Sequence, residues 1–333
     1  MTSGAEPTAG FSRVAVALTA LFSGVTVANL YVAHPILTLI GQSFGVSGDR
    51  AGVVVTIGQV GYTLGLFFVI PLGDVFRRTR LLAVLISIAC LGAVLAALMP
   101  TLPLLAAAMA VLCVAAVGAH ILVPLLVAAT PAERRGHALV LNNSAIVAGI
   151  ALSRVAYGAI GDLWGWRAVY LVAAGLTAVV GMAVIAVLPR EAVRPRTSYR
   201  NLIRSTARLV VDEPTVRWSA AIQMPVFAAY NLTWVMLALL LTGPHYHLSV
   251  ASAGLFGLCA AITVVTGPFV GRFLDRAGSR RSMALGCVTL VLGAVVMLFS
   301  TRSLVAVVVG LLLLIVGQQQ VGTANQSRVL AIR

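Results

Sequence analysis

The stretch GRFLDRAGSRR, residues 271–281, places one acid and four arginines between two long apolar runs. A looser copy, PLGDVFRRTR, occupies residues 71–80 in the same setting. Short basic loops between apolar runs are typical of the connections between membrane-spanning helices. The two stretches therefore indicate a protein that crosses the membrane many times.

The composition of the whole chain supports this interpretation. Of its 333 residues, 60% are hydrophobic and 10% are charged, whereas a soluble domain is roughly 45–50% apolar and about 25% charged. We therefore expect an all-α polytopic membrane protein. The sequence contains no phosphate-binding loop, metal-ligand cluster or nucleophile–base pair, which argues against an enzyme, ATP-driven transport, a bound metal and a cofactor.

Ten apolar runs are long enough to cross about 30 Å of hydrocarbon as helices. They cover residues 14–40, 51–72, 81–99, 103–129, 138–160, 168–188, 218–242, 251–271, 283–300 and 304–322. The first run is long enough to tilt or to bend near Pro35. The sequence therefore predicts about ten transmembrane helices.

The basic residues predict the orientation of these spans. All 23 are arginine, 19 lie on the same side as the N-terminus, and only Arg50, Arg167 and Arg302 lie in loops on the other side. This bias predicts that the N-terminus and, after an even number of spans, the C-terminus face the cytoplasm of a cell with a plasma or inner membrane. It also explains the net charge of +14 without a nucleic-acid partner.

The longest gap between spans, residues 189–217, divides the chain into two blocks. Arg200, Arg204 and Arg208 recur at every fourth position, so a helix would carry them as one stripe. Two interpretations remain open, an amphipathic helix on the inner leaflet and a solvated linker. The expected units are residues 1–188, the linker 189–217 and residues 218–333.

The two basic loops belong to an internal repeat. Each follows the second span of its block, and Asp74 and Asp275 are 275 − 74 = 201 residues apart. Asn29 precedes Asp74 by 45 residues, and Asn231 precedes Asp275 by 44. Duplicated helical bundles are a sequence sign of a secondary transporter that holds its substrate between the two halves.

Residues 271–281 resemble the G-x-[LF]-x-D-R-x-G-R-R signature of the major facilitator superfamily. In the second loop the signature is fitted by Gly271, Phe273, Asp275, Arg276, Gly278 and Arg280, while Ser279 departs from it and Arg281 follows one place late. In the first loop Leu72, Asp74 and Arg78 fit, and Ile70, Val75, Arg77 and Thr79 replace the usual residues. The stretch ANLYVAHPIL, residues 28–37, is similar to the first span of a bacterial efflux-type branch.

The resemblance covers nearly the whole chain and implies two pseudo-symmetric bundles. Because the superfamily pattern has twelve spans, it implies a six-helix N-terminal bundle at 1–188 and an incomplete C-terminal bundle of four helices at 218–333. We expect the last two helices to be missing.

The resemblance also implies that the basic loops act as gates. The carboxylate of Asp275 would contact the start of the fifth span, at Arg134 and Arg135, when the cytoplasmic side closes, because a carboxylate is stabilised by a helix N-terminus and by arginine. Asp74, Arg78, Gly271, Arg276, Gly278, Arg280 and Arg281 complete the predicted gating loops. The alternative is that these arginines only fix the topology.

The first, fourth, seventh and tenth spans line the cavity in superfamily transporters. Their polar residues, taken as candidates for substrate contact, are Asn29, Tyr31, His34, His120, Tyr230, Asn231, Trp234, Gln318 and Gln319. Each of them has an alternative role as a hydrogen-bonding link between helices. Since none of the nine acids lies at mid-membrane depth, His34 and His120 are the candidates for carrying a proton, and a structural role is the alternative.

Arg154 lies within the fifth span. One interpretation is structural: the side chain extends outward to the membrane surface and pairs with Asp162. The other is an anion site, because a guanidinium can bind a carboxylate or phosphate with two hydrogen bonds. The surrounding residues 149–158 depart from the antiporter motif of the superfamily at Ser153, Arg154 and Tyr157.

We therefore expect a monomeric secondary active transporter of a small solute, working by alternating access and driven by a gradient, with the proton as the expected coupling ion. Efflux follows from the resemblance alone. The alternative from another class is a truncated, non-transporting membrane protein or a membrane sensor.

Overall fold

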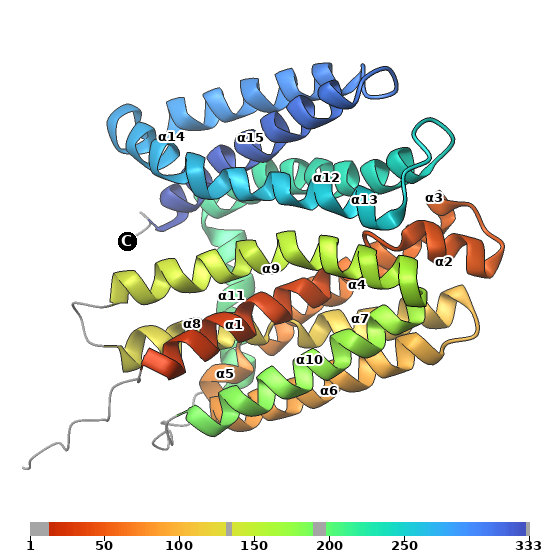
Figure 1. Cartoon of the computed structure of the whole chain (residues 1–333). Coiled ribbons are helices and arrows are strands. Elements are labelled where there is room, and N and C mark those ends of the chain that lie inside the picture. Colours follow the sequence, from red (N-terminus) through yellow and green to blue (C-terminus); the bar gives the residue numbers. More distant parts are fainter. Residues whose placement is uncertain (1–12, 131–134, 189–197, 331–333) are drawn as a thin grey trace, which may run out of the picture.

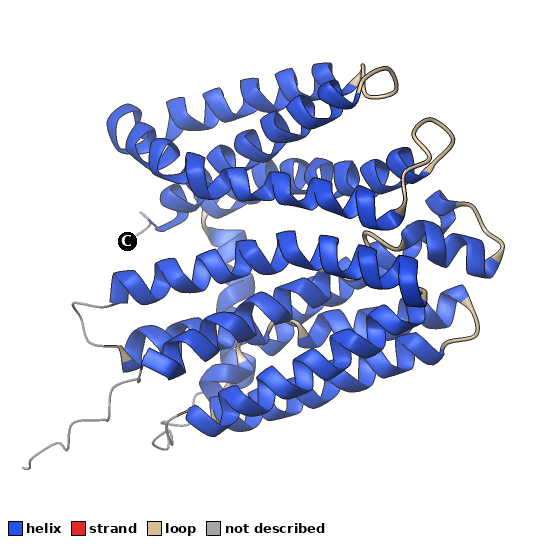
Figure 2. Ribbon diagram, in the orientation of Figure 1, coloured by secondary structure: helices blue, strands red, loops and turns tan. Residues whose placement is uncertain are grey.

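The computed structural model describes residues 13–130, 135–188 and 198–330 of the chain. Within these ranges every regular element is a helix (Figure 2). In lipid this is expected, because a helix satisfies all its backbone hydrogen bonds within one segment. The all-α prediction is confirmed.

The helices form two groups joined by a linker helix (Figure 1). The N-terminal half contains α1 (Arg13–Leu30), α2 (Leu37–Phe44), α3 (Gly48–Ala51), α4 (Val53–Leu64), the π-helix η1 (Gly65–Val69), α5 (Leu72–Val75), α6 (Arg78–Leu98), α7 (Leu102–Ala115), α8 (Gly118–Ala129), α9 (Arg135–Trp164) and α10 (Trp166–Val187). The linker is α11 (Tyr199–Asp212). The C-terminal half contains α12 (Pro214–Thr242), α13 (Val250–Leu255), the 3₁₀-helix η3 (Phe256–Ala261), α14 (Ile262–Met297) and α15 (Leu304–Leu330).

Eight helical segments of the described residues are long and apolar enough to cross a membrane. One of them, Val250–Met297, is 48 residues long and contains two of the predicted runs, separated by a sharp turn at Gly278. The first predicted run adds the shorter apolar helix Val14–Leu30. The count of about ten spans therefore agrees with the structure.

The first span is broken where the sequence predicts a bend. Between α1 and α2, the backbone of residues 31–36 forms tight turns in which Tyr31 donates to Ala28, His34 to Tyr31 and Ile36 to Ala33. Pro35 has no N–H to donate and its ring obstructs a continuous helix, so the chain can only resume a regular helix beyond it. The break lies near the middle of the run and carries Tyr31 and His34.

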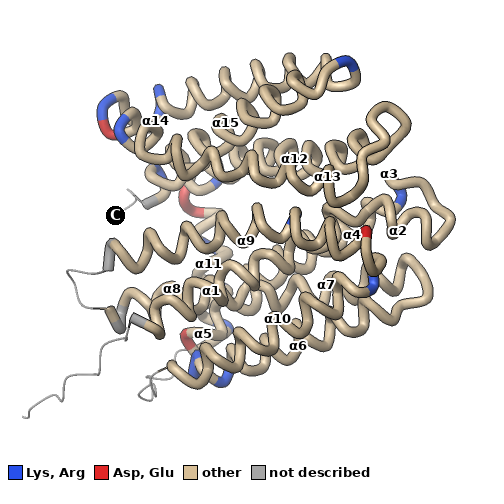
Figure 3. Tube along the Cα trace, in the orientation of Figure 1, with Lys and Arg blue, Asp and Glu red and all other residues tan. Residues whose placement is uncertain are grey.

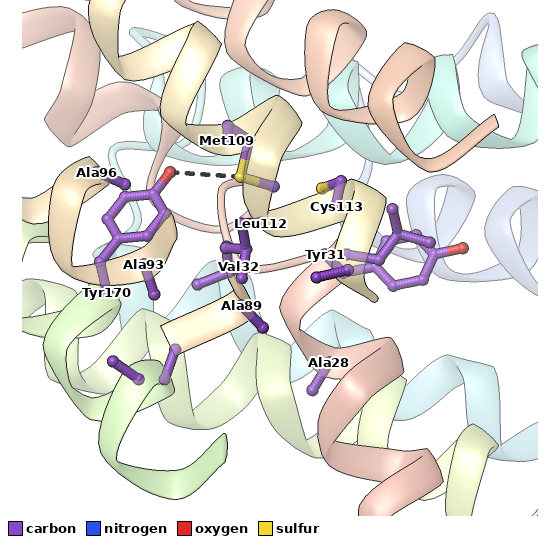
Figure 4. Packing of buried hydrophobic residues seen from close by; sticks show 14 of the residues in the cluster. Ala28, Tyr31, Val32, Ala89, Ala93, Ala96, Met109, Leu112, Cys113 and Tyr170 are labelled. Atoms are coloured by element: carbon purple, nitrogen blue, oxygen red, sulfur yellow. Dashed lines mark hydrogen bonds between the residues drawn. The ribbon is translucent and has the colours of Figure 1, made fainter. Parts of the chain in front are cut away.

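The core of the N-terminal half is built from small residues on one helix and large ones on its neighbours. Ala89, Ala93 and Ala96 of α6 face Tyr170 of α10 and Met109 of α7 (Figure 4), and all five are buried. The Tyr170 hydroxyl points at the Met109 sulfur, 3.9 Å away. Small side chains allow membrane helices to approach closely, which is the main source of packing energy where the surrounding lipid is equally apolar.

The charged residues mark the two ends of the molecule (Figure 3). We call the end that carries Arg77, Arg78, Arg80 and residues 272–281 the arginine-rich end, and the end that carries Arg50, Arg167 and Arg302 the arginine-poor end. Between them the outer faces of the helices are apolar, with exposed side chains such as Val179, Met182 and Val291. An apolar band between two polar ends is the surface that a lipid bilayer covers.

The linker is a helix, as one of the two open interpretations predicted. None of the residues of α11 is buried, and the Tyr199 hydroxyl donates a hydrogen bond to the carbonyl oxygen of Phe68 in the N-terminal half, 2.9 Å away. Leu209, Val210 and Val211 are exposed apolar residues of this helix. Arginines and exposed apolar residues on one helix are the features of a segment that lies at a membrane surface.

The two basic loops turn in different ways. Gly278 has φ 79° and ψ 164°, a conformation that is essentially restricted to glycine, so the signature glycine of this loop has a backbone reason. In the first loop Arg77 stands at the corresponding place, and its backbone is extended, with φ −61° and ψ 121°. The first loop therefore accommodates the loss of the glycine by taking another path. There Arg78, which is buried, donates to the Gly73 carbonyl oxygen at 3.4 Å and reaches Asp74 at 3.5 Å.

A pair of alanine substitutions distinguishes the effect of backbone conformation from the effect of steric crowding around an added Cβ atom. A Cβ atom added at either Gly278 or Gly271 would meet nothing within 4 Å, and only Gly278 has a positive φ. We expect Gly278→Ala to lower the free energy of unfolding by about 1–3 kcal/mol, and Gly271→Ala, in a regular helix, to leave it unchanged or raise it slightly. Thermal unfolding of the purified variants in detergent measures both, and equal stabilities would contradict the backbone argument.

Candidate functional site

The two halves meet through α9 on one side and α13 and η3 on the other. The contact is possible because glycines replace side chains there. A Cβ atom at Gly254 would lie 2.5 Å from the Arg154 carbonyl oxygen, one at Gly257 would lie 2.7 Å from the Arg154 Cβ, and one at Gly158 would lie 2.8 Å from the Val250 carbonyl oxygen. The glycines therefore let α9 approach the backbone of the opposite half closely around Arg154.

A carboxylate fastens the same contact at the arginine-poor end. Asp162, near the end of α9, accepts hydrogen bonds from the backbone N–H groups of Val250 at 3.2 Å and Ala251 at 2.7 Å. These are the first N–H groups of α13, where a negative charge is favourable. Thr38 and Thr242 add a hydroxyl–hydroxyl bond of 2.7 Å between the halves.

A cavity of about 630 Å³ separates the halves beyond this contact. Tyr31, directly after α1, and residues of α9 line it from one half, and residues of α12, η3, α14 and α15 line it from the other. Tyr31 and Tyr230 lie at its inner end, and Val140 and Gln326 line it toward the arginine-rich end. Four of the predicted substrate contacts, Tyr31, Tyr230, Gln318 and Gln319, line this cavity.

Arg154 lies at the centre of the interface, with only 3% of its surface exposed. Its guanidinium carbon is 3.6 Å from the centroid of the Trp234 ring and 5.1 Å from that of the Tyr31 ring. The Tyr230 side chain lies within weak hydrogen-bonding reach of the guanidinium, but none of the three side-chain nitrogens of Arg154 has a hydrogen bond of normal geometry. The structural interpretation, an arginine that extends outward and pairs with Asp162, is wrong because Arg154 is buried and the Asp162 oxygens are bound to α13.

A small void of about 20 Å³ adjoins Arg154. His34 and Trp234 also line it, and both are buried. The ring nitrogens of His34 and the indole N–H of Trp234 also have no hydrogen bond of normal geometry, although the Tyr31 backbone lies within weak reach of His34. A buried polar group without a good partner costs free energy, so a polar ligand at this place would stabilise all three groups.

The remaining predicted contacts lie away from this centre. Asn29 is buried in the N-terminal half and donates to the Thr177 hydroxyl at 2.8 Å. His120 is 2.7 Å from the Tyr62 hydroxyl. Asn231 donates to the Phe227 carbonyl oxygen at 2.9 Å and lies in a groove between α4 and α12. Their contacts fit the role of links within and between helices.

The predicted gating loops lie at the arginine-rich end (Figure 3). Asp74 contacts Arg78 within its own loop. Asp275, Arg276, Arg280 and Arg281 are exposed. Arg134 lies outside the described residues, and the side chain of Arg135 is likewise not described, so the predicted contact of Asp275 with the start of the fifth span falls outside the structure.

Two features of the site were not predicted from the sequence. The capping of α13 by Asp162 joins residues 88 and 89 positions apart, and the Thr38–Thr242 bond joins residues 204 apart. The available signal in the sequence was Asp162 itself, an acid that lies just beyond the fifth apolar run, on the side of the membrane that holds few charges. Within the described residues no group of three or more metal-binding side chains comes together.

Comparison with known proteins gives the family. The model for the Major Facilitator Superfamily matches residues 16–329. The chain belongs to this superfamily. It is 31% identical over 322 residues to the putative uncharacterized transporter YgaY of Escherichia coli K12, covering 97% of the chain and 82% of YgaY. It is 34% identical over 281 residues to the probable transporter SCO4007 of Streptomyces coelicolor, covering 84% of the chain and 65% of SCO4007.

Solved structures share the fold. A bacterial homologue of the human lysosomal transporter Spinster, in an inward-facing and unoccupied conformation, has a TM-score of 0.74 at 18% identity, covering 99% of this chain and 76% of the homologue. The xylose transporter XylE of Escherichia coli has a TM-score of 0.65 at 15% identity, covering 96% of this chain and 87% of XylE. The superfamily member is thus a solute transporter and not an enzyme.

Stability measurements distinguish helix links from cavity residues. Asn29→Ala removes a buried hydrogen bond to α10, so we expect it to lower the free energy of unfolding by about 0.6–2 kcal/mol. Gln318→Ala changes a residue that lines open space, so we expect a change below about 0.5 kcal/mol. Thermal unfolding in detergent checks both, and a stable Asn29→Ala protein would instead assign Asn29 to another role.

Proposed function

We propose that this superfamily member is a secondary active transporter that moves a small solute by alternating access. The observation that carries the proposal is the cavity of about 630 Å³ between the halves, together with the contact that closes the arginine-poor end beyond it. A carrier needs a central site that only one side reaches at a time, between two bundles that rock against each other.

The arginine bias assigns the two sides. The arginine-rich end faces the cytoplasm by the positive-inside rule, so both termini are cytoplasmic and the protein lies in the plasma or inner membrane. The conformation is then inward-open. The inward-facing Spinster homologue, which matches this chain well, supports the same assignment.

Closing the cytoplasmic side is the role that we assign to the basic loops. Asp162 accepts hydrogen bonds from the start of α13 at the arginine-poor end, and the signature loop presents Asp275 for the equivalent contact at the other end. A contact that exists in only one of two states shifts the equilibrium toward that state. Asp275 with Arg276, and Asp74 with Arg78, thus belong to the inward gate.

We further propose that a proton gradient drives the transport and that the solute moves out of the cell. His34 lines the void at the centre of the interface, and His120 is hydrogen-bonded to Tyr62 elsewhere in the N-terminal half. Histidine is the side chain that exchanges protons near neutral pH. Efflux rests on the similarity of residues 28–37 to exporters, and a monomer is the expected state.

A reversible cross-link tests alternating access without knowledge of the substrate. Thr38→Cys and Thr242→Cys, in a background without native cysteines, replace two hydroxyls that are 2.7 Å apart. A third cysteine at Gln318 reports on the cavity. Labelling is counted only on the peptide that contains residue 318, by mass spectrometry, because the free thiols at positions 38 and 242 also react with maleimide. We expect a membrane-impermeant maleimide to label position 318 from either face of oriented vesicles, but only from the cytoplasmic face once the disulfide forms.

The reduced protein is the control, because reduction must restore labelling from both faces. Labelling from the cytoplasmic face alone, with and without the disulfide, is the result for a static sensor and would overturn the proposal. A labelled Gln318→Cys protein without the cysteine pair excludes an effect of the oxidant.

Neutralising the acids that close each end shifts the same equilibrium. Asp162→Ala removes the acceptor of two N–H groups, so we expect labelling of the cavity cysteine from outside to rise about three- to tenfold. Asp275→Asn acts at the opposite gate, so labelling from outside falls and transport slows while the amount of inserted protein stays unchanged. Asp49→Ala, an acid at the arginine-poor end, serves as the matched control and leaves labelling unchanged.

A further inference from the structure

The geometry points to an organic anion as the substrate, with its carboxylate bound by Arg154 in the void that His34 and Trp234 line. This inference rests on the proposed function and specifies the chemistry of its central site. The guanidinium is buried at the boundary between the halves, and none of its three nitrogens has a hydrogen bond of normal geometry. Tyr230 is its one weak side-chain contact of this kind among the described residues.

Arg154 has no acidic partner among the described residues. All nine acids of the sequence lie outside the middle of the spans, and none of those in the described ranges forms an ion pair with Arg154. Asp162 is two helical turns away, and its two oxygens are bound to α13. A buried charge without a counter-charge costs several kcal/mol. An anionic ligand supplies the missing counter-charge.

The N–H donors of Arg154 are oriented so that a ligand can bind them. The face of the guanidinium lies against Trp234, at 3.6 Å from the ring centroid. Stacking of this kind uses the face of the planar group and leaves its N–H donors, which lie in the plane, free for hydrogen bonds. A carboxylate matches two parallel N–H groups of one guanidinium.

The size and the charge of the site favour a carboxylate over a phosphate. The void has a volume of about 20 Å³, which is room for one group the size of a water molecule. One oxygen of a carboxylate can enter it, whereas a tetrahedral phosphate with four oxygens is too large. Besides Arg154, the unpartnered atoms around it belong to His34 and Trp234, which supply neutral hydrogen-bond donors. One cation with two neutral neighbours balances a single negative charge.

The body of the substrate lies in the larger cavity. Tyr31 and Tyr230 line that cavity and also border the Arg154 site, Tyr31 through its ring and Tyr230 through its edge contact with Trp234 at 6.1 Å. Phe227, Val147 and Ile150 supply apolar lining nearby. The void and the cavity share no lining residue, so we place the apolar or aromatic body of the ligand in the cavity and its carboxylate at Arg154, which the two tyrosines border.

The position of the site ties binding to the movement of the halves. Arg154 belongs to α9 of the N-terminal half, whereas Trp234 belongs to α12 of the C-terminal half. A carboxylate bound by both stabilises the state in which they are in contact, and its departure removes that stabilisation.

Binding of small carboxylates to the purified protein tests the inference. The probes are acetate, hexanoate and benzoate, with benzyl alcohol and benzylamine as neutral and cationic counterparts of benzoate. We expect hexanoate or benzoate to bind to the wild type by calorimetry, and Arg154→Gln to weaken that binding about 10- to 100-fold. Arg154→Lys keeps the charge without the two-pronged geometry, so it loses part of the affinity.

Arg167→Gln is the matched control, because Arg167 also stacks on a tryptophan, at 4.2 Å from the ring centroid of Trp166, but is exposed and lines neither the void nor the cavity. It must bind carboxylates like the wild type. If Arg154→Gln does not fold, the loss of affinity in Arg154→Lys at unchanged thermal stability carries the test.

The inference is overturned if none of the three carboxylates binds to the wild type, if benzyl alcohol binds as well as benzoate, or if Arg154→Gln binds benzoate unchanged. Inorganic phosphate or sulfate that displaces the carboxylates at lower concentration overturns the choice of a carboxylate. None of these results alters two-sided labelling of the cavity, so failure of the anion site and failure of the transport proposal are distinguishable.

Discussion

The close contact of α9 with α13 and η3 is the constraint on which the rest of the structure depends. Glycines at 158, 254 and 257 remove the side chains that would hold the helices apart, and in lipid such packing replaces the hydrophobic effect as the force between helices. The contact holds the two halves together toward the arginine-poor end, leaves the cavity on its other side and buries Arg154. The closed end, the cavity and the charged centre therefore have a common origin.

The two charged residues of this contact have different kinds of partner and do not pair with each other. The acid of the interface, Asp162, interacts with backbone N–H groups, and the base, Arg154, interacts with aromatic faces. Direct pairing of the two would neutralise both and remove the reason for a ligand to bind. Their separation keeps a positive charge available at the place where the two halves meet.

The fold was largely predictable from the sequence, and the site only in part. Apolar runs specify helices because lipid leaves the backbone no other way to satisfy its hydrogen bonds, and Pro35 specified the break in the first span. Polar residues in a span are harder to assign, since Asn29 and Tyr31 are two positions apart and one faces Thr177 while the other lines the cavity. Which face a side chain occupies depends on packing between segments far apart in the chain, and the partners of Arg154 and Asp162 could not be read from spacing.

The π-helix at Gly65–Val69 has a mechanical consequence. The Phe68 carbonyl oxygen of this segment accepts the hydroxyl of Tyr199. The bulge thereby anchors the linker helix to the N-terminal half. The anchored linker leads directly into α12, with Glu213 as the single residue between the two helices. On the proposed alternating-access mechanism, a rotation of one half against the other would bend the chain at this residue.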